Sequence, residues 1–99
     1  MSDDDTGRST IMMLREEWDR VRARLRTYTG DAAFNSWLKP LALHEQDVVA
    51  DSIVLSTTTS FMRDWVTTHY LNKIRELWRM ERPAVRDVRV IVRPPERPP

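Results

Sequence analysis

Aromatic side chains are concentrated in two segments of this chain, and they constrain its fold more than any other feature. One segment reads FNSWLKPL, from Phe34 to Leu41, and the other reads FMRDWVTTHYLNKI, from Phe61 to Ile74. Aromatic rings bury large areas and usually anchor a core or an interface. Because the chain has 99 residues and a hydrophobic content of only 40%, it has room for one small domain. We therefore expect the core to be built around these rings.

The charge balance and the missing residue types exclude several classes of protein. The chain has 16 basic and 15 acidic residues, a net charge of +1, which is too small for strong non-specific binding to a polyanion. It has no cysteine, which excludes disulfides and the cysteine-containing zinc sites. The polar, acidic N-terminus is unlike a secretory signal, and no apolar run approaches the ~20 residues that span a membrane. We expect a cytoplasmic protein with no membrane contact.

No group of residues in the sequence is typical of an enzyme. Gly7 and Gly30 are the only glycines, so neither a P-loop nor a GxGxxG turn can form. His44 and His69 have no partner at metal-ligand spacing, and Asp64 has no partner for acid–base catalysis. We therefore expect no catalytic residue, no metal, no cofactor and no small-molecule substrate.

Apolar spacing and chain breakers predict two helices in the first half of the chain. Residues 1–9 are polar and indicate a disordered tail, and Thr10 is a suitable N-cap. The helix that follows has an apolar stripe at steps of three and four: Ile11, Leu14, Trp18, Val21 and Leu25. Gly30 ends this helix, and a short second helix runs from Ala32 and ends before Pro40.

The second half of the chain predicts three strands and one long helix. Alternating apolar residues indicate strands at about 41–46, at 52–57 and at 88–92. Between the last two strands, residues 61–80 have the broad apolar face of a helix. Residues 94–99 are rich in proline and resemble the start of a stiff linker.

The predicted order is helix, helix, strand, strand, helix, strand, within a domain of residues 10–93. Three short strands packed against helices on one face give a two-layer α+β fold. The following residues are expected to form its structural core: Leu25, Phe34, Trp37, Leu41, Leu55, Trp65, Tyr70 and Ile74.

The aromatic segments, their separation and the order of elements resemble the N-terminal domain family of the bacterial replication initiator DnaA. The resemblance runs from Trp18 to about Trp78, and more weakly to Val92. It is carried by Trp18, Leu25, Phe34-x-x-Trp37-x-x-Pro40-Leu41, Leu55, Phe61-x-x-Asp64-Trp65-Val66 and Tyr70-Leu71-Asn72-x-Ile74. It implies a fold similar to K-homology domains, although the GxxG loop that those domains use on nucleic acid is missing.

What the resemblance implies is a protein-interaction domain rather than an enzyme. Domains of this family self-associate with other DnaA molecules, help recruit the replicative helicase DnaB and bind regulators of initiation. ATP hydrolysis and recognition of duplex origin DNA belong to later domains. Two alternatives remain open: a stand-alone adaptor of the same fold that binds the initiator, and a module that binds single-stranded nucleic acid weakly through the arginine-rich first helix.

The resemblance also implies roles for individual residues. Trp18 matches an aromatic residue used for self-association, but its place in the apolar stripe fits the core equally well. Phe61 matches an exposed aromatic residue that holds the helicase, and Asp64 in the same motif is placed on this partner surface. Ala33 stands where the family often has an acidic helicase contact. Asp31, two residues earlier, is the candidate replacement.

Overall fold

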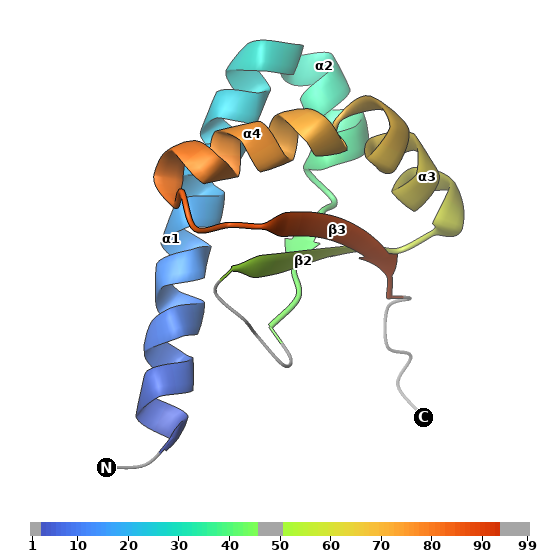
Figure 1. The fold of residues 1–99 in the computed structure, drawn as a ribbon. Coiled ribbons are helices and arrows are strands. Elements are labelled where there is room, and N and C mark those ends of the chain that lie inside the picture. The colour runs from blue at the N-terminus through green and yellow to red at the C-terminus, as the bar shows by residue number, and fades with distance from the viewer. Residues whose placement is uncertain (1–2, 46–50, 94–99) are drawn as a thin grey trace.

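The structure is a computed structural model that describes residues 3–45 and 51–93 (Figure 1). Its elements in chain order are α1 (Asp3–Thr29), α2 (Asp31–Ala33), the π-helical turn η1 (Phe34–Leu38), β1 (Ala42–Leu43), β2 (Ser52–Thr57), α3 (Ser60–His69), α4 (Leu71–Glu81) and β3 (Asp87–Val92). The predicted linker at 94–99 and the predicted end of the first strand at Gln46 lie outside the described residues.

Helix α1 buries four of the five residues of its predicted apolar stripe, and Ile11 is half-buried. Its buried apolar residues are Leu14, Trp18, Val21 and Leu25. The predicted helix start after Thr10 was wrong, because the backbone is helical from Asp3 onward, within the segment expected to be a tail. A polar, acidic segment is compatible with a helix start as well as with a tail, because acidic residues are favourable near the positive end of a helix dipole.

The second helical segment starts at a glycine and contains a widened turn. Gly30 has φ of 87°, a left-handed conformation that favours glycine, and it separates α1 from α2. In η1 the amide of Lys39 donates to the carbonyl of Phe34 over 2.7 Å, five residues back, which is the π-helical spacing. This turn buries Phe34 and Leu38 and leaves Trp37 half-buried.

The three strands form one open sheet in the order β1-β2-β3. Strand β1 pairs antiparallel with β2, and β2 pairs parallel with β3, with Ile53 opposite Val88 and Leu55 opposite Val90. The parallel pair requires a crossover, which α3 and α4 provide. Strand β1 is shorter than predicted, although the amide of His44 still donates to the carbonyl of Val54 over 2.9 Å.

The long third helix that the sequence predicts is two helices in the structure. Tyr70, with φ of −127° and ψ of −16°, separates α3 from α4. Its amide donates to the carbonyl of Val66 at the end of α3, and its carbonyl accepts from the amide of Ile74 at the start of α4. The prediction of one helix was wrong because the segment has no glycine or proline at the break. The two halves turn to pack on different neighbours, α3 on the sheet and α4 on both α1 and β3.

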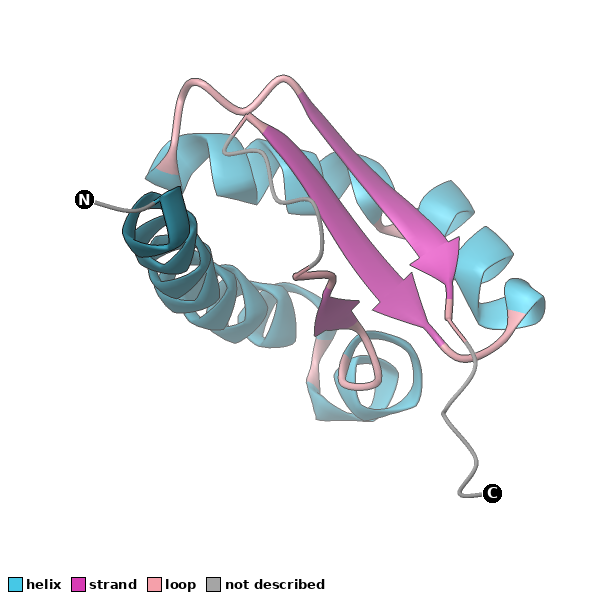
Figure 2. Cartoon of the chain, turned by 90° about the horizontal axis from the view of Figure 1, so that it is seen from below, coloured by secondary structure: helices cyan, strands magenta, loops and turns pink. Residues whose placement is uncertain are grey.

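Helices α3 and α4 lie over one face of β2 and β3 in Figure 1. Figure 2 shows the strands from below, with the long helix α1 beside them in the foreground. The fold is therefore mixed α+β with a three-stranded open sheet, and the likeness to K-homology domains stays a prediction. Five residues of the predicted core are buried: Leu25, Phe34, Leu41, Leu55 and Ile74. Trp37 and Tyr70 are half-buried against that core. Across residues 3–45 and 51–93, no helix has the length and hydrophobicity to cross a bilayer.

Candidate partner-binding site

Four ring side chains from η1 and α3 gather at the surface, and we call them the aromatic surface cluster. Trp37 of η1 stacks on Trp65 of α3 with their centroids 4.7 Å apart and their planes 19° apart. Phe61 lies 5.8 Å from Trp37 and 6.4 Å from Trp65. His69 lies 4.2 Å from Trp65 on the other side. The cluster therefore joins two elements that are distant in sequence.

Two aromatic side chains of the cluster are exposed to solvent rather than buried in the core. Phe61 is 66% exposed and Trp65 is 37% exposed, so the prediction of Trp65 in the core was wrong. The reason is visible in the helical spacing: Phe61, Trp65 and His69 follow one another at steps of four on one face of α3. Val66, which is fully buried, holds the core side of the helix. The rings of Phe61, Trp65 and His69 therefore form a stripe of their own, and this spacing is the sequence signal that separates them from the core side of α3.

The start of α3 fixes the position of Phe61. The hydroxyl of Thr59 accepts from the amide of Met62 over 3.2 Å, which caps the helix and places Phe61 in its first turn. Beside it, the exposed Asp64 carboxylate accepts from Nε of Arg63 over 3.0 Å. A shallow depression of about 190 Å³ is lined by Phe61, Asp64, Trp65, Thr68 and His69. The site thus combines an apolar patch with an acidic edge.

The other two predicted partner contacts lie on α2. Asp31 is exposed, and its carboxylate accepts from Nε of Arg26 on α1 over 2.7 Å. This hydrogen bond, with the positive charge of Arg26, lowers the pKa of the Asp31 carboxyl below its ordinary value. Ala33 is half-buried. The structure therefore brings Phe61 and Asp64 together, whereas Asp31 is directed towards α1.

Trp18, the predicted self-association residue, lies in the core. It is 4% exposed and stacks on Trp78 of α4 with centroids 5.5 Å apart and planes 8° apart. Of the two alternatives left open by the sequence, this placement favours the core. Trp18 and Trp78 join α1 to α4, and both are buried.

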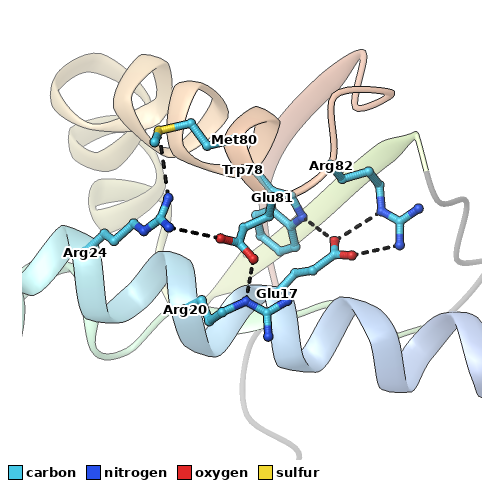
Figure 3. Close-up of polar contacts among 7 residues, drawn as sticks. All are labelled: Glu17, Arg20, Arg24, Trp78, Met80, Glu81 and Arg82. Atoms are coloured by element: carbon cyan, nitrogen blue, oxygen red, sulfur yellow. Dashed lines mark hydrogen bonds and ion pairs between the residues drawn. The ribbon is translucent and has the colours of Figure 1, made fainter.

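A buried carboxylate that the sequence analysis missed lies beside this pair (Figure 3). Glu17 is 6% exposed, and its Oε1 accepts from Nε1 of Trp78 over 2.9 Å. Arg82 donates to both oxygens of Glu17, from Nε over 3.1 Å and from Nη2 over 2.8 Å. Glu17 lies three residues after Leu14 and four before Val21, so its spacing already places it on the buried stripe.

A second carboxylate extends this contact between α1 and α4. Glu81 accepts from Nε of Arg20 and pairs with Nη2 of Arg24 at 3.3 Å (Figure 3). Together the two glutamates and three arginines hold the end of α4 against the middle of α1. Within the described ranges, no three His, Cys, Asp or Glu side chains are grouped as metal ligands are.

Comparison with known proteins supports the resemblance found in the sequence. The family model of the DnaA N-terminal domain matches residues 15–80, a range that contains the whole aromatic surface cluster. The chromosomal replication initiator protein DnaA of Rhodopseudomonas palustris strain TIE-1 is 36% identical over 85 residues, which cover 86% of this chain and 18% of that protein. The protein of the same name from Xanthobacter autotrophicus is 38% identical over 76 residues, 77% of this chain and 15% of that protein.

The comparison also shows how much of those relatives the chain represents. The chain spans less than a fifth of the length of both relatives, and residues 15–80 match the family model of the DnaA N-terminal domain. The family predicted from the two aromatic segments is confirmed. This chain belongs to the DnaA N-terminal domain family.

Proposed function

We propose that this domain binds protein partners for a chromosomal replication initiator, and that its aromatic surface cluster holds the replicative helicase DnaB. The observation that carries the proposal is the 66% exposure of Phe61 on a base of stacked tryptophans. Contiguous exposed apolar patches mark interaction sites, and aromatic residues dominate the binding energy of protein interfaces. Regulators of initiation are expected to use the same surface.

The cluster is organised before any partner binds. Trp37 and Trp65 stack on each other, and Trp37 packs against the core, so little side-chain freedom remains to be lost on binding. Phe61 is the exposed ring on this base. Such an anchor commonly accounts for 2 kcal/mol or more of binding, about thirtyfold in the dissociation constant.

The acidic contact common in the family must be met differently here. Ala33 has no carboxylate, and the carboxylate of Asp31 is engaged by Arg26. Asp64 also accepts from an arginine, the neighbouring Arg63, but unlike Asp31 it lies in the depression that Phe61 lines. We therefore propose that the aromatic rings supply most of the binding and that Asp64 supplies the charged edge.

A calorimetric titration of the helicase into the domain tests this proposal. Phe61→Ala should weaken binding by about tenfold or more, because the truncated ring loses its buried contact. Tyr28→Ala is the matched control, because Tyr28 is 61% exposed on α1 and lies outside the cluster. The circular dichroism of both variants should match that of the original chain. Equal affinity of the Phe61→Ala variant and the original chain would contradict the proposal.

Self-association is the second role that we propose, and it needs a surface other than Trp18. Met12 and Met13 are exposed on α1, where they offer apolar area to a second copy. Sedimentation velocity over a range of concentrations measures this association. Replacing both methionines by serine should reduce it, and an unchanged distribution of species would exclude this surface.

A further inference from the structure

A second surface site lies between α1 and η1. It is an open depression of about 490 Å³ that gathers three cationic side chains, Arg22 and Arg26 from α1 and Lys39 from the end of η1. Phe34 and Asn35 of η1 form part of its wall. Asp19 is the single acidic residue in the lining. The depression is therefore positive although the whole chain is nearly neutral.

Arg22 is held in an unusual state for an arginine of this chain. Its Cζ lies 5.8 Å from the ring centroid of Trp18 and 6.0 Å from that of Phe34, so two aromatic faces fix the guanidinium. Its Nε is buried and has no hydrogen-bond partner in the part of the chain that the structure describes. By contrast, Arg20, Arg24 and Arg82 each pair with a glutamate.

The guanidinium of Arg22 is half-buried, held by two rings and without a polar partner in residues 3–45 and 51–93, which favours binding of an anion. The buried Nε is closed to a ligand, but Arg22 lines the depression and its guanidinium makes no hydrogen bond or ion pair with the described residues. Its terminal N–H groups are therefore the donors that a ligand oxygen would meet. Arg26 donates a hydrogen bond from its Nε to Asp31 and retains further donors, since a guanidinium carries five N–H groups. Lys39 adds an exposed ammonium at the rim.

From this arrangement we propose that the depression, which we call the basic pocket, binds a single carboxylate side chain of an acidic protein segment. A planar guanidinium donates two parallel hydrogen bonds to the two oxygens of a carboxylate. The carboxylates of Asp19 in the lining and of Asp31, which pairs with Arg26, would repel the successive phosphates of a nucleic-acid strand. A single carboxylate brings one negative charge and therefore meets less of this repulsion than a strand of phosphates does.

The basic pocket and the aromatic surface cluster share one short element. Phe34 and Asn35 of η1 face the pocket, whereas Trp37 of η1 stacks in the cluster. A partner that places an apolar side chain on Phe61 and an acidic one near Arg22 would contact both sides of η1. The pocket proposal does not depend on the identity of that partner.

Nuclear magnetic resonance titration with a blocked oligoglutamate peptide at low salt tests the basic pocket. The Nε–H signal of Arg22 and the backbone amide of Asn35 should shift in a saturable way. Arg22→Gln should weaken peptide binding by about tenfold, the loss expected for one hydrogen bond between charged groups. Arg89→Gln is the matched control, because Arg89 is an exposed arginine on β3. It should leave the affinity unchanged.

Each other outcome overturns the proposal. Absence of saturable shifts shows that no carboxylate binds, and equal weakening by Arg22→Gln and Arg89→Gln shows general charge attraction. A separate titration with oligothymidylate that shifts the same signals more strongly than the peptide shows a nucleic-acid site instead. If Arg22→Gln disturbs the buried Trp18 signal, Lys39→Gln replaces it as the test variant, and unchanged affinity there counts against the pocket.

Discussion

At the scale of single residues, the most constrained side chain is a buried acid. Glu17 satisfies both carboxylate oxygens with Trp78 and Arg82, and this links the middle of α1 to the end of α4. Buried ion pairs are stable only when hydrogen bonds compensate for lost hydration, and removing one partner leaves the other uncompensated. The contribution of Glu17 to the free energy of unfolding is therefore best measured by replacing it.

Glu17→Ala should lower the free energy of unfolding by about 3 kcal/mol, because it leaves Arg82 unpaired and Trp78 Nε1 without an acceptor. The measurement is urea denaturation followed by circular dichroism. Glu16→Ala is the control, since Glu16 is exposed, and it should change stability by less than about 0.5 kcal/mol. A similar loss in both variants would show that the effect comes from helix charge rather than from the buried contact.

A second residue-scale prediction concerns Asp31 and acid. The hydrogen bond from Arg26 lowers the pKa of the Asp31 carboxyl in the folded domain. A lowered folded pKa means that this pair stabilises the fold above the pKa of the unfolded chain, and that the stabilisation is lost as pH falls through the folded pKa. In Arg26→Gln, the carboxyl should titrate nearer its ordinary value of about 3.9. Carboxyl carbon signals followed against pH measure this, and an identical midpoint in both proteins would exclude the pair.

At the scale of elements, the sequence predicts what local pattern determines and misses what packing determines. The buried stripe of α1, the strand at 52–57 and the glycine at 30 follow from spacing and backbone chemistry. The break at Tyr70 and the π-helical turn of η1 contain no glycine or proline, so no helix-breaking residue predicts them. On either side of the break at Tyr70 the neighbours differ in part: α3 contacts η1, β2 and β3, whereas α4 contacts α1 and β3.

The candidate site divides in the same way. The exposure of Phe61 could be predicted, because Phe61 matches an exposed aromatic residue of the family that the sequence resembles. The exposure of Trp65 could not be predicted from its hydrophobicity alone, because it depends on which face of α3 the sheet covers. The burial of Trp18 was one of two alternatives that its place in the apolar stripe left open, whereas its stacking partner Trp78, sixty residues later in the chain, could not be predicted from a local pattern.

The cap of α3 gives an element-scale prediction. Thr59→Ala removes the oxygen that accepts from the amide of Met62, and it should cost about 1 kcal/mol of unfolding free energy. Thr58→Ala changes the preceding exposed threonine and should have little effect. Thermal denaturation of the two variants measures the difference. Equal stability of the two would mean that the hydroxyl of Thr59 does not cap the helix.

At the scale of the whole molecule, the four tryptophans form two pairs with different environments. Trp18 and Trp78 stack inside the core between α1 and α4, where they hold the long helix against the rest of the domain. Trp37 and Trp65 stack at the surface, where they support the exposed ring of Phe61. The first pair therefore belongs to the core, and the second pair belongs to the surface that we propose for partner binding.

The most direct test of this separation is the response of the four indole N–H signals to the replicative helicase, measured by proton–nitrogen correlation spectra of the labelled domain. Trp37 and Trp65 belong to the proposed site, whereas Trp18 and Trp78 are buried controls within the same molecule. The account predicts shifts or broadening at Trp65 and Trp37 that exceed any change at Trp18 and Trp78. Unperturbed Trp65 and Trp37 signals under conditions where the helicase binds would contradict it.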